Sequence, residues 1–508
     1  MSDVTSETAG PTFCPRQRRV YVLVAAILAS SMGFIDGTVV SIATPAIRAD
    51  LGASLSDAQW ISNAYLLLLS SLLLIGGAAG DRFGIRNVFA AGIGLFVGAS
   101  AICALAPDPL FLIVARAVQG LGAAFMVPAS LAIIAKAYPK AERGKAIGTW
   151  AAASSLTTIL GPVLGGLVLT WLGDWSWRLV FAINLPLGGI ALALLLVQVP
   201  PDQPEQGRRL DLVGGAFATM GLLLVALGLT GTGQAMSLWQ SALLVLSGAV
   251  VLGGFLLWEA RFKAPMLPLG LFRHIGFSGA QGLTFALYFS LSAITFYLPM
   301  TLIAGWGMNP AQVSIVLLPL GIALTVLSPF AGSLADRVGP GPMIAAGATL
   351  VALSFLGIGM TMSLHDPWFV LLPLTGLFGI GMGLVVSPLS TAVMTSVADH
   401  DTGIASGVNN AVARVAGLFA VATMGGVIAV VFDSSLGLLA ELDIFFGVAP
   451  ASPLVAAEEA VRIAATDAAF AAVCYVTAAL SLLSAAIAWF TQEKRLGGQA
   501  KEATARRD

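Results

Sequence analysis

Two residues of opposite charge lie deep in apolar stretches of this chain: Asp36 in residues 20–46 and Arg116 in residues 110–136. An ion at the centre of a bilayer costs about 2.5 to 3.5 kcal/mol even on a mild insertion scale, so such residues face a cavity or a partner. A guanidinium keeps its charge, whereas a carboxyl group can take up and release a proton. The sequence therefore predicts that Asp36 carries protons and that Arg116 grips it through a bidentate fork. The alternative is an ion pair that only fixes two helices.

A third charge, Arg414, follows Asn409 and Asn410 in the apolar stretch 404–431, which contains no acidic residue. A cavity with two arginines and Asp36 as its acid should bind doubly charged cations poorly and favour neutral, singly charged or anionic amphiphiles. The aromatic residues proposed to line it are Phe34, Tyr65, Trp150 and Tyr288. The alternative for these rings is a lipid-facing or core position. Tyr65 and Tyr288 are favoured because a phenol in hydrocarbon needs a partner.

The pattern G-x-x-x-D-R-x-G occurs twice, each time directly after an apolar run. A glycine four residues before the aspartate allows a close helix approach, the aspartate can attract the positive N-terminus of another helix, and the last glycine permits a tight turn. Matched repeats in two apolar halves are typical of transporters built from duplicated bundles. A polar loop without further function is the alternative. The two copies consist of Gly77, Asp81, Arg82 and Gly84, and of Gly332, Asp336, Arg337 and Gly339.

The composition indicates an integral membrane protein, because 57% of the residues are hydrophobic, 10% are charged and the mean hydropathy is +0.91, whereas soluble domains carry about 25% charged residues. At about 20 residues per span, the apolar runs predict an all-α fold with fourteen transmembrane helices. The predicted spans are 20–46, 58–80, 88–106, 110–136, 146–172, 179–199, 212–231, 239–258, 276–303, 311–334, 342–363, 368–391, 404–431 and 467–491.

The loops that alternate along the chain differ in charge. Most Lys and Arg residues fall on one side of the predicted membrane, together with both termini, and the opposite loops carry essentially Arg48, Arg178 and Arg462. The positive-inside rule then predicts a multi-pass membrane protein with both termini in the cytoplasm.

The spacing of the two repeats predicts two six-helix bundles separated by an extra pair of helices. We expect a cytoplasmic N-terminal tail over residues 1–19, a first bundle over 20–200 and linkers with two added membrane helices over 201–273. A second bundle follows over 274–491, with a long external loop at 432–466. The C-terminal tail covers residues 492–508.

Several motifs resemble the fourteen-span drug:proton antiporter branch of the major facilitator superfamily, over essentially the whole chain. IDGTVVSIATP supplies Asp36, Thr38 and Pro45, and RAVQGLG supplies Arg116, Gln119, Gly120 and Gly122. The segment GPVLGG, with Gly161, Pro162, Gly165 and Gly166, is similar to the end of the antiporter signature, although Ala153 and Thr157 replace glycines common there. The resemblance implies that the repeated loops act as a latch between the halves. It also implies that a bend at Pro162 seals the centre against protons, whereas tight packing is the alternative for the small residues.

The resemblance implies export of amphiphilic small molecules across the bacterial plasma (inner) membrane, in exchange for protons and by alternating access. We expect no cofactor, no metal, no enzymatic activity and no nucleic-acid partner, because the three cysteines and three histidines have no ligand spacing or catalytic motif. The expected partners are the substrate, protons and the lipid bilayer, and a monomer is plausible. A flippase for lipids or cell-envelope precursors and an uncoupled facilitator on the same fold remain alternatives.

Overall fold

The computed structural model describes residues 12–204, 210–231, 236–398, 401–437, 439, 444–450 and 453–493. Within these ranges the chain forms helices and no strands, and fourteen helical segments are long and apolar enough to cross a membrane. The predicted all-α fold with fourteen spans is thereby confirmed. The two predicted tails fall mainly outside the described residues.

The first half contains six spans. The sixth is divided at Ile183 into two helices that continue in the same direction. Helix starts are fixed locally: Ser54 and Asp57 form a capping box, and Asp108 accepts a hydrogen bond from the Phe111 amide just before Pro109. The helices are α1 Arg19–Leu51, α2 Leu55–Phe83, α3 Ile85–Ala104, α4 Pro109–Ala137, α5 Lys140–Leu172, α6 Trp177–Ala182 and α7 Asn184–Gln198.

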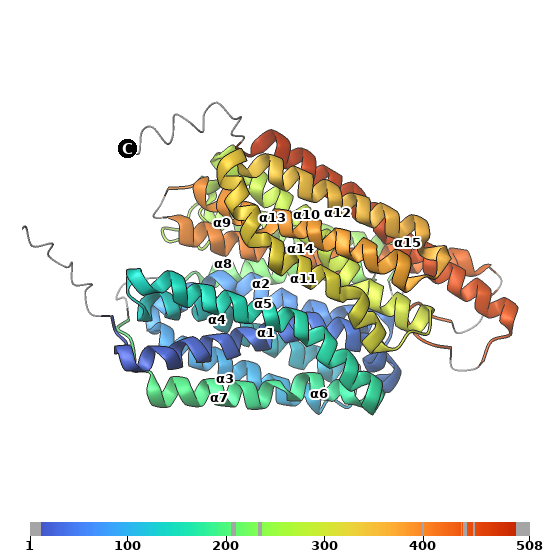
Figure 1. Cartoon of the computed structure of the whole chain (residues 1–508), viewed down its shortest axis with the longest axis horizontal. Coiled ribbons are helices and arrows are strands. Elements are labelled where there is room, and N and C mark those ends of the chain that lie inside the picture. Colours follow the sequence, from blue (N-terminus) through green and yellow to red (C-terminus); the bar gives the residue numbers. More distant parts are fainter. Residues whose placement is uncertain are drawn as a thin grey trace, which may run out of the picture.

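The second half repeats this arrangement, and Figure 1 shows the two bundles lying against each other. Its helices are α10 Ile275–Met300, α11 Pro310–Val338, α12 Pro340–Thr361, α13 Leu372–Thr395, α14 Thr402–Leu436 and α15 Ala456–Thr491. Short π-helical turns extend α10 over 301–305 and precede α13 over 367–371.

The extra pair consists of α8 Leu212–Gly231 and α9 Leu238–Glu259. Helix α8 packs against both α2 and α14, so it touches both halves at their junction. Thr219 of α8 donates a hydrogen bond to Ser71 of α2 (2.9 Å), and Leu222 packs in a cluster with Leu67 and Leu418. Helix α9 packs mainly on α8. The pair is therefore docked at the junction by α8.

The helices extend beyond several predicted spans, most clearly around the loop predicted over 432–466. Helix α14 continues to Leu436 and α15 begins at Ala456, so the connecting segment is shorter than predicted. The first turns of α15 carry Glu458, Glu459 and Arg462, and the last two form an ion pair (2.6 Å). A span search that rejects charged residues misses a helix that continues past the apolar core.

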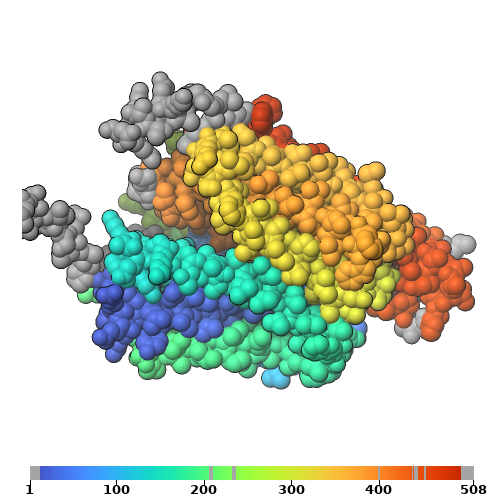
Figure 2. Space-filling view, viewed as in Figure 1, coloured from blue at the N-terminus to red at the C-terminus, as the bar shows by residue number. Residues whose placement is uncertain are grey.

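Helices α2 and α14 pack against each other across the junction of the two halves, whereas the hydrogen bonds between the halves lie mainly towards one end of the molecule. One face of the molecule carries the start of α1 and the ends of α2 and α15, and we call it the terminal face. The face at the other end of the helices is called the opposite face. Hydrogen bonds between the halves gather towards the opposite face, where Gln59 of α2 donates to the Tyr297 hydroxyl (2.9 Å) and to the Val421 carbonyl (2.5 Å). Figure 2 shows the halves in contact there and diverging towards the terminal face.

Candidate functional site

Asp36 and Arg116 form an ion pair inside the first half. Asp36 is fully buried and Arg116 is 2% exposed. The Arg116 Nη1 atom lies 2.7 Å from Asp36 Oδ1 and 2.6 Å from Oδ2, and Arg116 Nε donates to the Ile61 carbonyl (3.0 Å). The predicted bidentate fork is therefore wrong, because both carboxylate oxygens contact the same nitrogen. The guanidinium instead bridges Asp36 on α1 and the backbone of α2.

Polar side chains from α4 itself and from two further helices, α3 and α7, continue this pair. Gln119, one turn after Arg116 on α4, donates to Asp36 Oδ1 (3.1 Å) and to the Ser100 hydroxyl (2.9 Å), and it accepts from Arg116 Nη1 (2.6 Å). Asn184 on α7 also donates to Ser100 (3.2 Å). Each member is buried, so the network both orients Asp36 and separates it from water in this conformation.

Tyr65 covers the guanidinium of Arg116. Its ring centroid lies 4.4 Å from Arg116 Cζ, which is cation–π geometry. Helices α2 and α4 can approach this closely because a Cβ atom on Gly120 would overlap the Tyr65 backbone. Tyr65 and Tyr288 are both close enough to Arg414 to interact electrostatically with it. The three deep charges predicted from the sequence are thus brought to one region, and Tyr65 lies near all three.

The other residues predicted for the cavity are divided between the halves. Phe34 and Trp150 are partly buried in the first half, where the Trp150 indole donates to Ser30 (2.9 Å). On the other side of the junction, the following residues are partly buried: Tyr288 on α10, and Asn409, Asn410 and Arg414 on α14. The Asn409 side-chain oxygen accepts from Thr284 (2.8 Å). Asp36 and Tyr65 are buried rather than exposed to a cavity in this conformation.

The two repeated loops have the same backbone geometry. Gly84 and Gly339 adopt φ angles of 89° and 88°, a region that favours glycine, and α3 and α12 begin directly after them. At the first loop the Asp202 carboxylate accepts from the Ile85 amide (2.9 Å) and the Arg86 amide (3.0 Å). Asp202 was assigned only to a linker by sequence; its position after a Pro-Pro pair gave no sign that it caps a helix.

The helix contact predicted at Gly77 occurs one residue earlier. A Cβ on Gly77 would lie 3.9 Å from Pro128, which is ordinary contact, whereas a Cβ on Gly76 would overlap the Ala124 carbonyl. In the second copy a Cβ on Gly332 would overlap the Ser387 hydroxyl. The repeat predicts the position of the turn. In the first copy, however, the glycine that allows α4 to approach closely is Gly76, which lies outside the repeated pattern.

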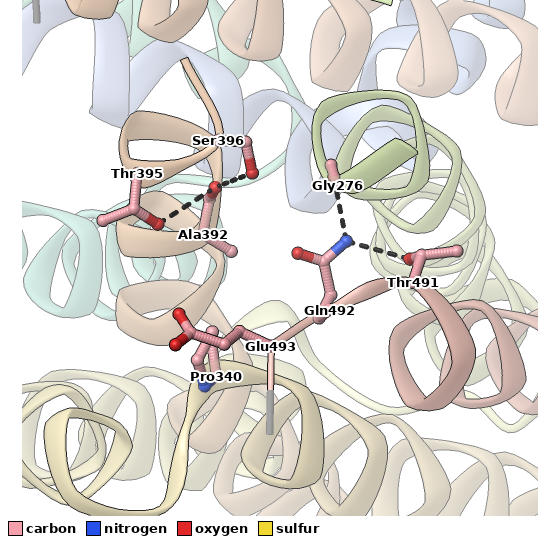
Figure 3. Close-up of a pocket in the computed structure, with 8 residues that line it drawn as sticks. All are labelled: Gly276, Pro340, Ala392, Thr395, Ser396, Thr491, Gln492 and Glu493. Carbon is pink, nitrogen blue, oxygen red and sulfur yellow. Dashed lines mark hydrogen bonds between the residues drawn. The ribbon is translucent and has the colours of Figure 1, made fainter. Parts of the chain in front are cut away.

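Figure 3 shows a pocket of the second half with a volume of about 310 Å³. It opens at the terminal face between the ends of α10, α12, α13 and α15. Gln492 reaches into it and donates to the Gly276 carbonyl (3.0 Å), while the Gly341 amide bonds the Glu493 carbonyl (3.1 Å). These contacts join helix ends, so we assign this pocket to packing rather than to the junction of the halves.

The segment predicted to form an antiporter bend lies at the contact between α5 and α11. Helix α5 continues through Pro162, whose carbonyl accepts from the Ser314 hydroxyl (2.7 Å). A Cβ on Gly166 would lie 2.7 Å from the Pro310 carbonyl, and one on Gly165 would overlap Val39 of α1. Gly161 has only ordinary contacts. Small residues here allow α5 to approach α1 and α11 together towards the opposite face.

Two six-helix bundles with an ion pair buried inside the first are an architecture typical of membrane transporters. The family model of the Major Facilitator Superfamily matches residues 25–421 and 282–507. The chain therefore belongs to the major facilitator superfamily. It is a transporter rather than an enzyme, and it is a multi-pass bacterial membrane protein.

Curated relatives of similar length share about a third of its residues. It is 34% identical over 423 residues to the puromycin resistance protein pur8 of Streptomyces alboniger, covering 81% of this chain and 82% of the relative. It is 31% identical over 421 residues to the multidrug resistance protein Stp of Mycobacterium tuberculosis (82% and 77%). The tetracenomycin C resistance and export protein of Streptomyces glaucescens is 32% identical over 414 residues (79% and 74%).

Solved structures support the fold. A bacterial homologue of the human lysosomal transporter Spinster, in an inward-facing and unoccupied conformation, has a TM-score of 0.67 at 16% identity and covers 95% of this chain and 100% of its own. The D-xylose–proton symporter has a TM-score of 0.62 at 16% identity (94% and 99%). Both share the major facilitator fold with this chain.

Proposed function

We propose that this transporter exports amphiphilic small molecules in exchange for protons. The observation that carries the proposal is the buried pair of Asp36 and Arg116, held by Gln119 near the middle of α1. Asp36 is the eighteenth residue of a helix that runs from Arg19 to Leu51, so at 1.5 Å per residue it lies about 25 Å along α1. Relatives named for drug resistance and export support the same role.

The sealed position of Asp36 suggests how protons are coupled to transport. In the conformation described, its carboxylate has no exposed surface and accepts bonds from Arg116 and Gln119. Proton uptake then requires a second conformation in which α1 and α4 expose the carboxylate to water. If each conformation opens the carboxylate to at most one side of the membrane, protons have no continuous path along which to leak.

A proton gradient supplies enough energy for this exchange without a cofactor. One elementary charge is worth about 2.3 kcal/mol per 100 mV, so one proton at roughly 150 mV supplies about 3.5 kcal/mol. At about 1.4 kcal/mol per tenfold concentration difference, this supports a gradient of a few hundred-fold for a neutral substrate.

The terminal face is proposed to lie in the cytoplasm. It carries Arg16, Arg18, Arg82, Arg86 and Lys140, as the positive-inside rule requires. With this orientation, the halves diverge towards the cytoplasm and touch near the outer surface. The described conformation would then receive substrate from inside the cell. The repeated loops at Asp81 and Asp336 lie on the same face, where a latch between the halves would act.

The charge of the junction favours neutral, anionic or singly charged substrates. Arg414 is partly buried there, and no hydrogen bond or ion pair of the described residues neutralises it. Asp36, the acidic residue predicted for the cavity, already forms an ion pair with Arg116. A dication would therefore meet a net positive site.

The proposal is tested with inside-out vesicles from cells that express the chain. Amphiphiles found to be less toxic to expressing cells are used as substrates. We expect uphill uptake driven by a proton gradient, loss of uptake with a protonophore and loss of uptake in Asp36→Asn. Uptake that only equilibrates and is indifferent to the protonophore would indicate a facilitator. Movement of labelled lipid between leaflets without uptake of soluble amphiphiles would indicate a flippase.

A further inference from the structure

Two buried carboxyl groups outside the proposed transport site lie at the terminal face, where α8 begins and α9 ends. Asp211 is 4% exposed and Glu259 is 3% exposed. Asp211 Oδ1 accepts from the Gly214 amide (2.7 Å) and the Trp258 indole (2.9 Å), and Glu259 Oε2 accepts from the Leu267 amide (3.0 Å). One oxygen of each carboxyl group therefore accepts hydrogen bonds from backbone amides or from the indole ring.

The second oxygen of each group has no hydrogen-bond donor. Asp211 Oδ2 and Glu259 Oε1 are both buried and unpartnered. A Cβ placed on Gly214 would lie 2.7 Å from Asp211 Oδ2 and 2.6 Å from Glu259 Oε1. The two oxygens therefore face the same point above Gly214, where the absence of a side chain leaves room for both.

No positive side chain of the described residues compensates this pair. In the segment after α9, Arg261 and Lys263 are exposed, and neither forms an ion pair with the two carboxyl groups. At this face α2, which packs on α8, carries Asp81 and the exposed Arg82, and Asp401 directly precedes α14; among the described residues Arg82 forms no ion pair with Asp211 or Glu259. Arg208 and Arg209, earlier in the chain, lie outside the described residues.

We propose that Asp211 and Glu259 form a proton-binding site in which the two carboxyl groups share one proton. Two buried carboxylates that face each other cannot both keep their charge. A single proton on one oxygen donates to the other, so it satisfies both unpartnered atoms at once. This site is separate from Asp36 and does not depend on the proposed export function.

The shared proton connects the two linkers that flank the extra helix pair. Asp211 ends the linker from the first half and caps α8, while Glu259 binds the Leu267 amide in the linker that leads to α10. Loss of the proton would leave two like charges where α8 and α9 meet. The attachment of both linkers to the helix pair should therefore weaken as the cytoplasm becomes alkaline.

The sign of the pH effect follows from linkage. In an unfolded chain, Asp and Glu release their protons near pH 4, whereas the folded pair retains one proton above that pH. The folded protein then binds more protons than the unfolded chain, so the stability supplied by this site decreases as the pH rises. Replacing either carboxyl group by an amide installs a permanent donor and removes this dependence.

The test is thermal unfolding of the purified full chain in detergent between pH 6 and pH 9. Between pH 6 and pH 9 the unfolding temperature of the wild type should fall by a few degrees more than that of Glu259→Gln. A difference of this size is about what one altered interaction produces. Asp174→Asn, a carboxyl-to-amide change at an exposed site, should follow the wild type. Asp211→Asn, whose oxygen can still cap α8, is a second variant in case Glu259→Gln folds poorly.

Two results would overturn the proposal. Parallel pH profiles for wild type and both amide variants would show that no shared proton exists. A wild type that is stabilised by sodium, magnesium or calcium ions at pH 9, with no such effect in Glu259→Gln, would show that a metal cation occupies the space. The expected infrared signature is a protonated carboxyl band at neutral pH that is absent from the amide variants.

Discussion

The replacement Asp36→Asn separates a proton carrier from a structural ion pair when it is combined with a change at its partner. The structure gives Asp36 three hydrogen bonds, two from Arg116 and one from Gln119, with no exposed surface. Removing one member of a buried pair costs about 3 to 5 kcal/mol, because an uncompensated charge remains. Asn keeps one acceptor oxygen, so we expect a loss near the lower limit, about 3 kcal/mol.

The double variant Asp36→Asn/Arg116→Gln removes both charges. It should recover much of the lost stability, since neutral replacement of a buried pair is often tolerated. About 1 to 2 kcal/mol should stay lost, because Gln at position 116 lacks the bond to the Ile61 carbonyl and the stacking on Tyr65. Neither variant should transport substrate uphill, since neither can carry a proton at this position.

The assay pairs denaturant unfolding in detergent with proton-driven uptake in vesicles. We expect the single variant to be less stable than the wild type and the double variant to be of intermediate stability. Neither variant should show uphill uptake. Uphill uptake in the double variant would refute the reasoning, because it would show that the charges only hold α1 and α4 together. Equal instability of the single and double variants would show that the charge left on Arg116 is not the cause.

The remaining predictions concern the positioning, loop and selectivity residues. Arg116→Lys should reduce transport by at least tenfold although the charge is kept, because an ammonium cannot bond Asp36 and the α2 backbone together; vesicle uptake at wild-type rates would contradict this. Asp202→Ala should lower stability by about 1 to 3 kcal/mol through loss of the α3 cap, measured by unfolding, with uptake per folded molecule unchanged. Asp81→Asn should slow exchange across the membrane more than it weakens substrate binding, and the reverse pattern would exclude a latch. Asn410→Asp should create resistance to bis-quaternary compounds that wild type lacks, and wild-type resistance to such dications would remove Arg414 from the selectivity account.

The fold could be predicted because long apolar segments and a repeated turn motif in the sequence have a direct physical meaning. Runs without charge, such as 212–258, must be helices in a membrane, and a repeated glycine turn marks both halves. The pairing of Asp36 with Arg116 also followed, since each charge needed a partner at the same depth. The glycines of the repeated turns could also be predicted, because few other residues adopt a positive φ angle.

Other parts of the site carry no signal of this kind. Ser100 and Asn184 complete the Asp36 network, yet single polar residues in membrane helices are common. Gln59, which joins the halves at the opposite face, looks like an ordinary residue of the first turns of α2. Asp211 and Glu259 lie at helix ends, where charges normally reach water, so only the three-dimensional arrangement shows that both are buried and face each other. Contacts between distant segments depend on helix rotation, which sequence periodicity in uniformly apolar helices does not define.

The most direct test of the central claim is proton movement caused by substrate. Purified protein is reconstituted with a pH-sensitive dye inside vesicles that hold an acidic interior, and a protective amphiphile is added outside to protein whose terminal face points outward. The account predicts that substrate entry raises the internal pH in wild type and leaves it unchanged in Asp36→Asn. Substrate accumulation without any change of internal pH, or an equal proton flux in Asp36→Asn, would contradict proton exchange through Asp36.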